Sequence, residues 1–441
     1  MMSMHRGRKI RVVGSKHSWS QVVCNDDILV DLRYLNSVDV RRTADQVFAE
    51  IGAGCTIEHA LSQLNQQGLT LPSLGLITKQ TIAGAMATGT HGSGRHSLSH
   101  YLRSAEIAHY HRESNEPVLQ TVDRGDELLA ARCALGSLGI MTSVTIPVIS
   151  QFQIEEHFAR HSDLDSVLAA EEAFPLQQFY FAPWRWDYFA QHRRPVSARR
   201  SWLAPVYRMY WSVGMDRVFH WLILALVRIC SFAVTKFFYR RVLGWLIPLK
   251  WKVTDRSDRQ LTMQHQLFRH IEIEIFVTRS RLHEAMEFVE WMLKHAAGET
   301  DSDNKPWQTI LSSSGLWQQT QSLRGQYRHH YPICIRKVLA DETLISMTSG
   351  TEDYYAISLI SYARPMQRHG FELFSEVIAK TMATLFRARP HWGKFCPLKV
   401  QELRKLYPDF EEFLEVKKEF DTGSIFDNSW TEELFRQPTN E

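Results

Sequence analysis

The sequence has no pair of cysteines at the close spacing of a metal-binding or redox motif. A Cys-x-x-Cys pair would indicate a zinc site or thiol redox chemistry, and closely spaced cysteines would indicate a disulfide framework. Neither pattern occurs in the 441 residues. We therefore expect a reduced compartment, no disulfides and no structural zinc. The six cysteines are Cys24, Cys55, Cys133, Cys230, Cys334 and Cys396.

The chain also has little net charge, and it contains neither internal repeats nor low-complexity segments. Its formal charge is +3, from 51 lysines and arginines against 48 acidic residues, which gives no reason to expect a nucleic-acid partner. Residues 1–11 are basic but lack an apolar core, so we expect no signal peptide. The length favours two domains or more.

An uninterrupted apolar run of membrane-spanning length is missing too, although residues 202–251 are rich in aromatic and aliphatic side chains. Their most apolar part, 218–234, is interrupted by His220 and Arg228, whereas a spanning helix needs about 20 mostly apolar residues. Flanking cations with aromatic residues are typical of a helix that lies in a membrane interface. The alternative is a buried helical hairpin, and we favour the membrane interface. The cations are Arg208, Arg217, Lys236, Arg240, Arg241, Lys250 and Lys252.

The N-terminal third alternates β-branched runs with helical stretches. Strands are predicted at 12–13, 28–32, 47–51 and 144–148. Residues 56–67 predict a helix that Thr56 caps and Gly68 ends. This alternation indicates an α+β domain, to which we assign residues 1–150.

The second domain is assigned to residues 151–395, with the apolar insert at 202–251. Strands are predicted at 179–184, 333–338 and 355–362, in one antiparallel sheet, and a helix at 281–294. Residues 271–277 alternate apolar side chains with Glu272 and Glu274, which predicts a half-buried strand. The two carboxylates are candidates for lining a polar site, but we expect a solvated strand face for at least one. Residues 396–441 are expected to form a charged helical segment.

Three glycine-containing turns punctuate the first domain. The first, residues 14–18, follows a β-branched run, and such a turn aims backbone N–H groups into a concavity that suits a phosphate or pyrophosphate. The second, residues 81–94, consists mostly of small residues that let backbone approach a ligand. Tight packing explains its alanines and glycines but not Thr88, Thr90 and His91, which are expected to bond a large polar cofactor. The third turn is residues 135–140. The residues that we assign to the cofactor are Gly14, Ser15, Lys16, His17, Ser18, Thr81, Ala83, Gly84, Thr88, Gly89, Thr90, His91, Gly92, Gly139 and Ile140.

The order of these turns resembles the FAD domain of the aldonolactone oxidases. This branch of the vanillyl-alcohol-oxidase-like flavoproteins includes L-gulonolactone oxidase and D-arabinono-1,4-lactone oxidase. Residues 389–394, Arg-Pro-His-Trp-Gly-Lys, and residues 420–428 are similar to its other signatures. The resemblance covers nearly the whole chain. It implies an α+β fold with a PCMH-type FAD-binding domain and a substrate, or cap, domain in which helices flank an antiparallel sheet. The family has one more βαβ unit before the first turn, so we expect this chain to lack that unit.

The resemblance also implies roles for individual residues. His17 corresponds to the histidine that is bonded covalently to the 8α carbon of the flavin. Lys16 replaces a family glycine; its charge suits a pyrophosphate, but most residues resist the dihedral angles that glycine adopts.

In the second domain, Lys394 corresponds to the family's active-site lysine, and His391 of the same motif is expected to contact substrate. Arg336 corresponds to the arginine of a Pro-Val-Glu-Val-Arg motif. The glutamate position of that motif holds Cys334, a weak hydrogen-bond acceptor, so substrate binding is expected to be looser or its preference altered.

The function implied is FAD-dependent oxidation of an aldono-1,4-lactone, L-gulono- or D-arabinono-, with O2 as acceptor and H2O2 as product, in ascorbate-type biosynthesis. The expected location is an endoplasmic reticulum (microsomal) or mitochondrial membrane. The alternatives are a dehydrogenase with another acceptor and a catalytically inactive, membrane-associated relative, for which Lys16 and Cys334 both speak. The loose spacing of His91, His96 and His100 does not predict a metal site.

Overall fold

Two of the strands predicted in the N-terminal third, at 47–51 and 144–148, belong to a five-stranded antiparallel sheet in the computed structural model, which describes residues 2–5, 7–229, 231–263, 270–299, 305–362 and 365–436. The predicted helix is α1 (Ile57–Gln66), in which Thr56 accepts the backbone N–H of His59 at 3.2 Å. Two early strands, β1 (Ile10–Val13) and β2 (Ile28–Asp31), pair with each other in parallel. The strands of the five-stranded sheet lie in the order β3 (Val38–Arg42), β4 (Val47–Gly52), β8 (Ile140–Pro147), β6 (Ser104–Tyr110) and β7 (Pro117–Val122).

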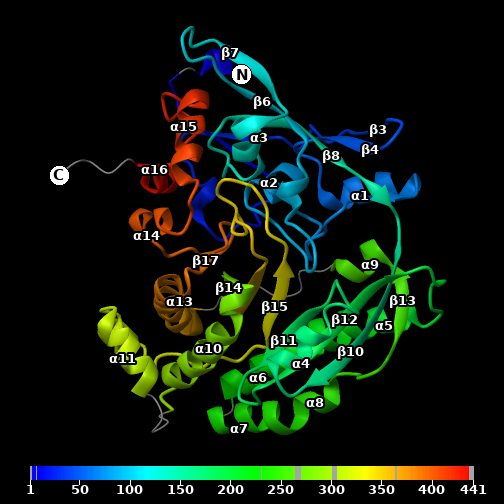
Figure 1. The fold of residues 1–441 in the computed structure, drawn as a ribbon, viewed down its shortest axis with the longest axis vertical. Coiled ribbons are helices and arrows are strands. Elements are labelled where there is room, and N and C mark those ends of the chain that lie inside the picture. Colours follow the sequence, from blue (N-terminus) through cyan, green and yellow to red (C-terminus); the bar gives the residue numbers. More distant parts are fainter. Residues whose placement is uncertain are drawn as a thin grey trace.

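The second half of the chain is built on a larger, eight-stranded antiparallel sheet (Figure 1). It contains all four strands predicted there, and it adds strands whose polar residues gave no clear periodic signal. In spatial order the strands are β13 (Val253–Arg256), β10 (Gln153–His161), β12 (Asp187–Val196), β11 (Gln178–Ala182), β15 (Ile333–Val338), β16 (Tyr354–Tyr362), β14 (His270–Thr278) and β17 (Arg389–Pro390).

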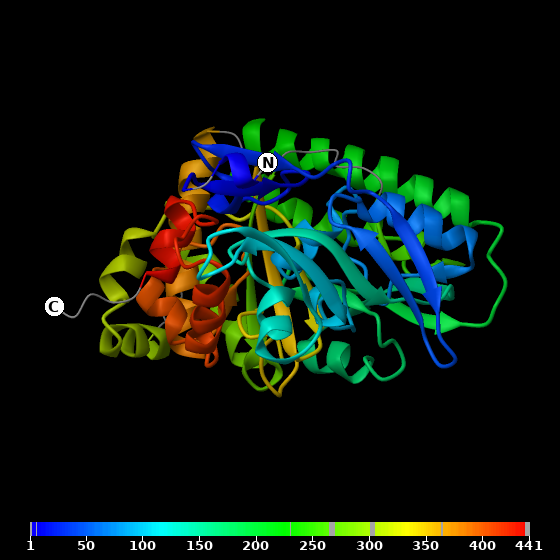
Figure 2. The same ribbon diagram turned by 90° about the horizontal axis from the view of Figure 1, so that it is seen from above.

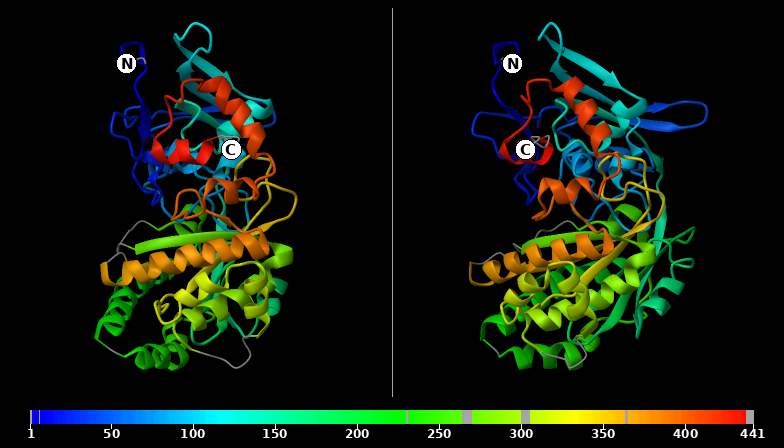
Figure 3. Two further views of the ribbon diagram at one scale, coloured as in Figure 1. Left: turned by 90° about the vertical axis from the view of Figure 1, so that its left-hand side faces the viewer. Right: turned by 60° about the vertical axis from the view of Figure 1, so that its left-hand side comes forward.

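Helices α10 (Leu282–Ala296) and α13 (Pro365–Phe386) cover one face of this sheet (Figure 3). The isoleucines of β14, Ile271, Ile273 and Ile275, are buried in the same core as the apolar stripe of α10. Their burial on this side turns Glu272 and Glu274 to the other face of the sheet, because successive side chains of a strand point to opposite faces.

The segment 202–251 forms consecutive helices that run along one side of the molecule (Figure 2). It packs on the face of the large sheet that carries Phe158 and Phe189, through Phe219, Ile223 and Leu243. None of the helices in the described part of the chain is both long and apolar enough to cross a bilayer. The helices are α5 (Ala204–Met209), the π-helix η4 (Tyr210–Phe219), α6 (His220–Ile229), α7 (Phe232–Phe237), the π-helix η5 (Phe238–Val242) and α8 (Leu243–Leu246).

The C-terminal segment is helical, as expected, and it returns to the beginning of the chain. Helix α15 (Phe410–Phe420) contacts α3 (Gly125–Arg132), and the Ile10 N–H donates to the Ile425 carbonyl at 2.8 Å. Helices α14 (Val400–Arg404) and α16 (Ser429–Phe435) lie beside it.

Candidate active site

One cavity of about 1160 Å³ is lined by all three glycine-containing turns and by the face of the large sheet that α10 and α13 leave uncovered. Most small-molecule sites measure about 300–1,000 Å³. The cavity is therefore large enough to hold a sizeable cofactor together with a second ligand.

The first turn forms the wall of this cavity with residues 14–18. Lys16 adopts the left-handed backbone conformation, with φ at +56°, at a cost of about 1 kcal/mol for a residue with a Cβ. The lysine thus takes the conformation that the family glycine would supply. A Cβ at Gly14 would clash with the side chain of Thr81, so the first turn packs directly against the second.

The second turn contributes Thr81, Ala83, Gly84, Thr88, Thr90 and His91 to the wall, around helix α2 (Ile82–Ala87). Gly89 and Gly92 do not line the cavity. A Cβ at Gly89 would lie 2.6 Å from Met347, and one at Gly92 would clash with the Leu74 carbonyl. These two glycines are needed for close packing rather than for ligand contact.

The third turn reaches the cavity through Gly136 and Gly139. Gly139 has φ at +138°, and a Cβ there would lie 2.6 Å from the Ala108 carbonyl oxygen. Ile140 does not line the cavity; it packs in a small core with Ile10 and Tyr110 instead.

Arg11, which the sequence did not single out, ties the third turn to β1 and to the C-terminal segment. Its guanidinium donates to the carbonyls of Leu135 at 2.7 Å, Gly136 at 3.2 Å and Phe426 at 2.5 Å, and also to that of Val22. The side chain is buried. A lone arginine between Ile10 and Val12 in an apolar strand was the signal available for it.

The opposite wall of the cavity is the polar face of β14, β15 and β16. Glu274 and Cys334 both register with Ser358, which places the three strands' side chains in one row. Glu272 and Glu274 are 7% and 2% exposed, so the expectation of a solvated face for at least one of them is wrong. The packing of the isoleucines on α10 turns both carboxylates toward the cavity.

Lys394 lies at this polar wall and pairs with Glu272, with 2.5 Å between Nζ and Oε2. Ser358 donates to the other oxygen of the same carboxylate. Burial alone would raise the pKa of Glu272, but the neighbouring Lys394 and His270 hold it well below its ordinary value. The result is a buried, fixed ion pair at the cavity wall.

Arg336 finds its carboxylate on the neighbouring part of the sheet. Its Nη1 lies 3.8 Å from Glu274 Oε1, and its Nε donates to Gln178 at 3.2 Å. Cys334 leaves the usual position without an acid, and Glu274 supplies one from β14. A carboxylate therefore lies beside Arg336 in this cavity, although position 334 holds a thiol.

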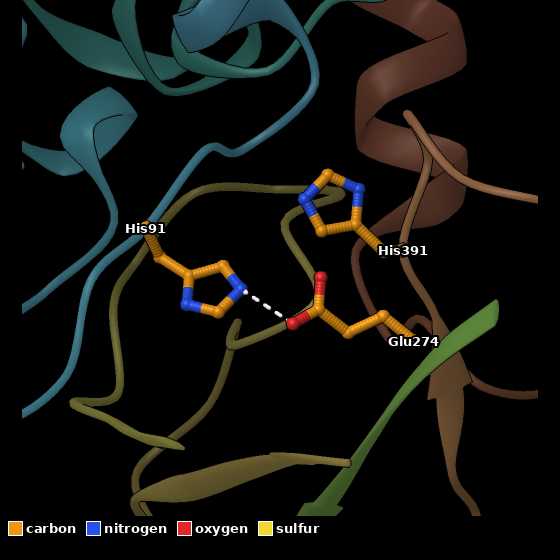
Figure 4. A group of neighbouring side chains, drawn as sticks. All are labelled: His91, Glu274 and His391. Carbon is orange, nitrogen blue, oxygen red and sulfur yellow. Dashed lines mark ion pairs between the residues drawn. The ribbon is translucent and has the colours of Figure 1, made fainter. Parts of the chain in front are cut away.

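His91, Glu274 and His391 form a buried cluster (Figure 4). One ring nitrogen of each histidine and one carboxylate oxygen of Glu274 lie within 4.8 Å of one another. The Gly393 N–H donates to His391 Nδ1 at 2.9 Å, so the neutral ring carries its proton on Nε2. Burial lowers the pKa of His391 to about 3, which keeps this ring neutral.

The other histidine of the cluster is oriented differently. His91 Nδ1 donates to the Gly92 carbonyl at 2.9 Å, and its Nε2 faces Glu274 Oε1 at 3.4 Å. Two histidines and a carboxylate also match a metal-ligand set. However, His391 presents an N–H rather than a lone pair at Nε2, which favours a hydrogen-bond network.

The far half of the cavity is apolar and belongs largely to the helical segment. There, side chains of η4 and α8 face aromatic residues of the sheet, and the rings of Phe158 and Trp211 stack at 4.6 Å between centroids. The apolar lining residues are Phe158, Phe189, Met209, Trp211, Met215, Phe219, Leu243 and Ile247.

Two protein families match parts of this chain. Residues 3–109 match the family described as FAD binding domain, and residues 144–434 match D-arabinono-1,4-lactone oxidase. The chain is 47% identical to a long-chain alcohol oxidase of an uncultured marine euryarchaeote, over 98% of this chain and 91% of that protein. It is 24% identical to L-gulonolactone oxidase of Mus musculus, over 98% and 91%. The cholesterol oxidase of B. sterolicum shares the fold, with a TM-score of 0.68 at 15% identity over 97% and 90% of the two chains.

The residues at the cavity fit the dinucleotide that these matches imply. Gly14, Gly84 and Gly139 expose backbone rather than side chains at the wall, and Lys16 adds a positive charge beside the first turn. The cofactor of this protein is FAD. The chain belongs to the D-arabinono-1,4-lactone oxidase family of FAD-linked oxidoreductases.

Proposed function

We propose that the protein oxidises a hydroxyl-bearing carbon of its substrate to a carbonyl, with O2 as the final electron acceptor and H2O2 as product. The observation that carries the proposal is the convergence of three glycine turns and a charged strand face on one cavity. In this proposal residues 1–150 bind FAD, residues 151–395 bind substrate, and residues 396–441 pack against the first strand. The family implies an aldono-1,4-lactone as substrate.

FAD, when bound, supplies the acceptor for the hydride that leaves the substrate carbon. The chain's task is to orient the hydroxyl group and to stabilise the negative charge that develops on its oxygen as the proton is lost. Lys394 and Arg336 place two cations at the polar wall, and His391 offers an Nε2–H.

Glu274 is suited to orient the substrate hydroxyl by accepting a hydrogen bond from it. Burial alone would raise the pKa of this carboxyl, but His91 lowers it to about 2, so it stays ionised. An ionised carboxylate accepts hydrogen bonds without donating any. The Glu274 side chain thus takes over the part that Cys334 cannot play.

The absorbance spectrum of the purified protein tests this proposal. We expect flavin peaks that bleach under anaerobic conditions when L-gulono-1,4-lactone or another hydroxyl substrate is added, and that return with H2O2 when O2 is admitted. A chain that purifies without flavin, or whose flavin no hydroxyl substrate bleaches, would contradict the proposal. Bleaching that only an added electron carrier reverses would point to a dehydrogenase.

We also propose that His17 holds the flavin covalently. Burial lowers the pKa of this imidazole, and Lys394 lowers it further, so near pH 7 the ring is neutral and nucleophilic. We expect acid precipitation to leave the flavin in the pellet of the wild-type protein and to release it from His17→Ala. The matched control is His59→Ala, on the exposed side of α1, which should behave as wild type. Release from all three proteins would contradict the covalent link.

A third part of the proposal is that the helical segment binds an anionic membrane surface. Residues 202–251 contain seven lysines and arginines but one acidic residue. Large apolar side chains on the segment are strongly exposed, among them Trp202 at 85%, Trp221 at 65% and Trp245 at 90%. Basic residues interleaved with exposed aromatic ones favour a bilayer interface that contains anionic lipid.

Cosedimentation with vesicles checks this attachment. We expect the wild-type protein to pellet with vesicles that contain phosphatidylglycerol and to bind weakly to pure phosphatidylcholine. Trp202→Ser combined with Trp245→Ser should reduce binding at least tenfold. Tyr34→Ser, which removes an aromatic side chain that is 88% exposed outside the segment, serves as the control. Equal binding of all variants would contradict the membrane assignment.

A further inference from the structure

We propose that the apolar half of the cavity is a subsite for an aliphatic chain, so that the substrate is a lipophilic alcohol rather than a polar sugar derivative. This inference rests on the proposed FAD-linked oxidation and adds the substrate class. The alcohol carbon loses a hydride to FAD and its hydroxyl loses a proton, which leaves an aldehyde; the two electrons end on O2 as H2O2.

The floor of the cavity changes from polar to apolar along one row of side chains. Five cavity-lining residues register one with the next across β14, β16, β15, β11 and β12. The row begins at a carboxylate and ends at a phenyl ring. In order, the residues are Glu274, Ser358, Cys334, Tyr180 and Phe189.

This gradient places the chemistry at one end and an apolar surface at the other. Glu274 lies beside Arg336 and His91, where a hydroxyl group finds hydrogen-bond partners. Beyond Cys334 the row turns aromatic. The thiol therefore marks the point at which a bound molecule passes from polar to apolar surroundings.

The roof over the apolar end is mostly hydrocarbon and ring surface, although Ser212 and the buried Trp211 Nε1–H also belong to it. Trp211, Met215 and Phe219 of η4 and Leu243 of α8 supply hydrocarbon and ring surface. The charged side chains Glu156 and Arg193 at this end form an ion pair with each other. Glu156 binds Arg193 at 2.6 Å and accepts the Tyr207 hydroxyl at 2.6 Å.

A sugar placed there would lose most of its hydrogen bonds to water without replacement, which is unfavourable, whereas a methylene group gains from leaving water. The volume of the cavity supports the same assignment, because it exceeds the usual range for one ligand.

The apolar end of the cavity is open to the surface of the protein. Met209 both lines the cavity and is 60% exposed, so the apolar end reaches the surface at the helical segment. Val206 and Val213, exposed at 45% and 44%, lie on the same helical stretch. The opening is thus bordered by the surface assigned above to the membrane, from which a lipophilic alcohol would be drawn.

Anaerobic bleaching of the flavin by primary alcohols of increasing length, from 1-butanol to 1-dodecanol, tests the inference. Each added methylene should lower the half-saturating concentration about fourfold until the apolar half is filled. L-gulono-1,4-lactone should need far higher concentrations. If the lactone bleaches the flavin efficiently and dodecanol does not, the subsite is refuted while the oxidase function stands.

A pair of tryptophan variants localises the chain to the cavity. Met215→Trp fills the apolar half, and we expect it to raise the half-saturating concentration of dodecanol at least tenfold while that of butanol stays the same. Val218→Trp adds the same bulk on the same helix, but at a position that is 60% exposed, and should leave both values unchanged. Equal effects of the two variants would overturn the placement. Leu243→Trp repeats the test from α8, in case Met215→Trp does not fold.

A binding measurement separates this inference from the proposed chemistry. Methyl dodecyl ether has the alkyl chain but no oxidisable hydroxyl group. We expect it to raise the midpoint of thermal unfolding of the flavin-loaded wild-type protein, and not that of Met215→Trp. A shift without any alcohol-dependent bleaching would support the subsite and refute the oxidase function. No shift in the wild-type protein, together with no dependence on chain length, would overturn the subsite.

Discussion

Lys394→Met should slow the bleaching of the flavin by substrate about 100-fold to 1,000-fold, the range found when one preorganised group that stabilises developing charge is removed. The half-saturating substrate concentration should change less than tenfold. Negative charge on the substrate oxygen develops only as the reaction proceeds, so the ammonium group stabilises the transition state more than the bound substrate. Stopped-flow absorbance of the flavin measures both quantities.

The surroundings of Lys394 decide which control is needed. Its ammonium is held against Glu272, and removal of the cation leaves that carboxylate buried beside His270 and Ser358. An unpaired buried charge is itself unfavourable. The double variant Lys394→Met, Glu272→Gln removes both partners. Bleaching should stay slow in this variant, because the missing positive charge is the cause; recovery of the rate would assign the loss to the stranded carboxylate instead.

Lys337→Met is the matched substitution outside the cavity. Lys337 neighbours Arg336 on β15 but points to the opposite face, where it pairs with Asp353 at 3.2 Å and Glu171 at 3.7 Å. The same side-chain change there should leave the bleaching rate within about twofold of wild type. If Lys337→Met slowed bleaching as much as Lys394→Met, the role of Lys394 in the reaction would be contradicted.

Local sequence signals were sufficient for the elements whose periodicity is set by a single buried face. Strand β15 lies where it was predicted, and α1 starts at its Thr56 cap and ends just before Gly68. The three glycine turns also meet at one cavity, as the resemblance implied. The residues that form each strand, helix or turn are neighbours in sequence, whereas the meeting of the three turns was expected only from the resemblance.

Local sequence signals do not predict the surroundings of the two carboxylates of β14. An alternating strand has the same sequence pattern whether its polar face meets solvent or a cavity. For Glu272 and Glu274 the answer depends on β15 and β16, more than 50 residues away, and on the 391–394 loop. The position of Glu274 near Arg336 and in register with Cys334 through Ser358 depends on the order of strands in the sheet, which no short motif encodes.

The same limit explains the residues that do not line the cavity. Gly89, Gly92 and Ile140 lie within the motif stretches, but whether a position faces a ligand or a neighbouring segment depends on tertiary contacts such as those to Met347 and Leu74. The strands β10 and β12 were not predicted, for a related reason. Their polar residues, such as Glu156 and Arg193, pair across the strands inside the protein.

Arg11→Met should destabilise the protein by about 3 kcal/mol or more, since each buried carbonyl left without a donor costs about 1–3 kcal/mol. The side chain of Arg11 is 2% exposed and serves carbonyls on three separate segments. Burial lowers the pKa of this guanidinium to about 10, with Asp427 and Asp421 opposing the decrease, so it stays charged at pH 7. A methionine fills similar space but donates no hydrogen bond.

The effect should extend from stability to cofactor binding. The carbonyls of Leu135 and Gly136 belong to the third turn, which contacts the cavity, and that of Phe426 belongs to the segment packed on β1. We expect the flavin content of Arg11→Met to fall as the urea midpoint of unfolding decreases. Arg41→Met, an exposed arginine of β3 whose partner is Glu50, should change neither quantity. A variant that kept full flavin content and the wild-type midpoint would show that the third turn holds its position without Arg11.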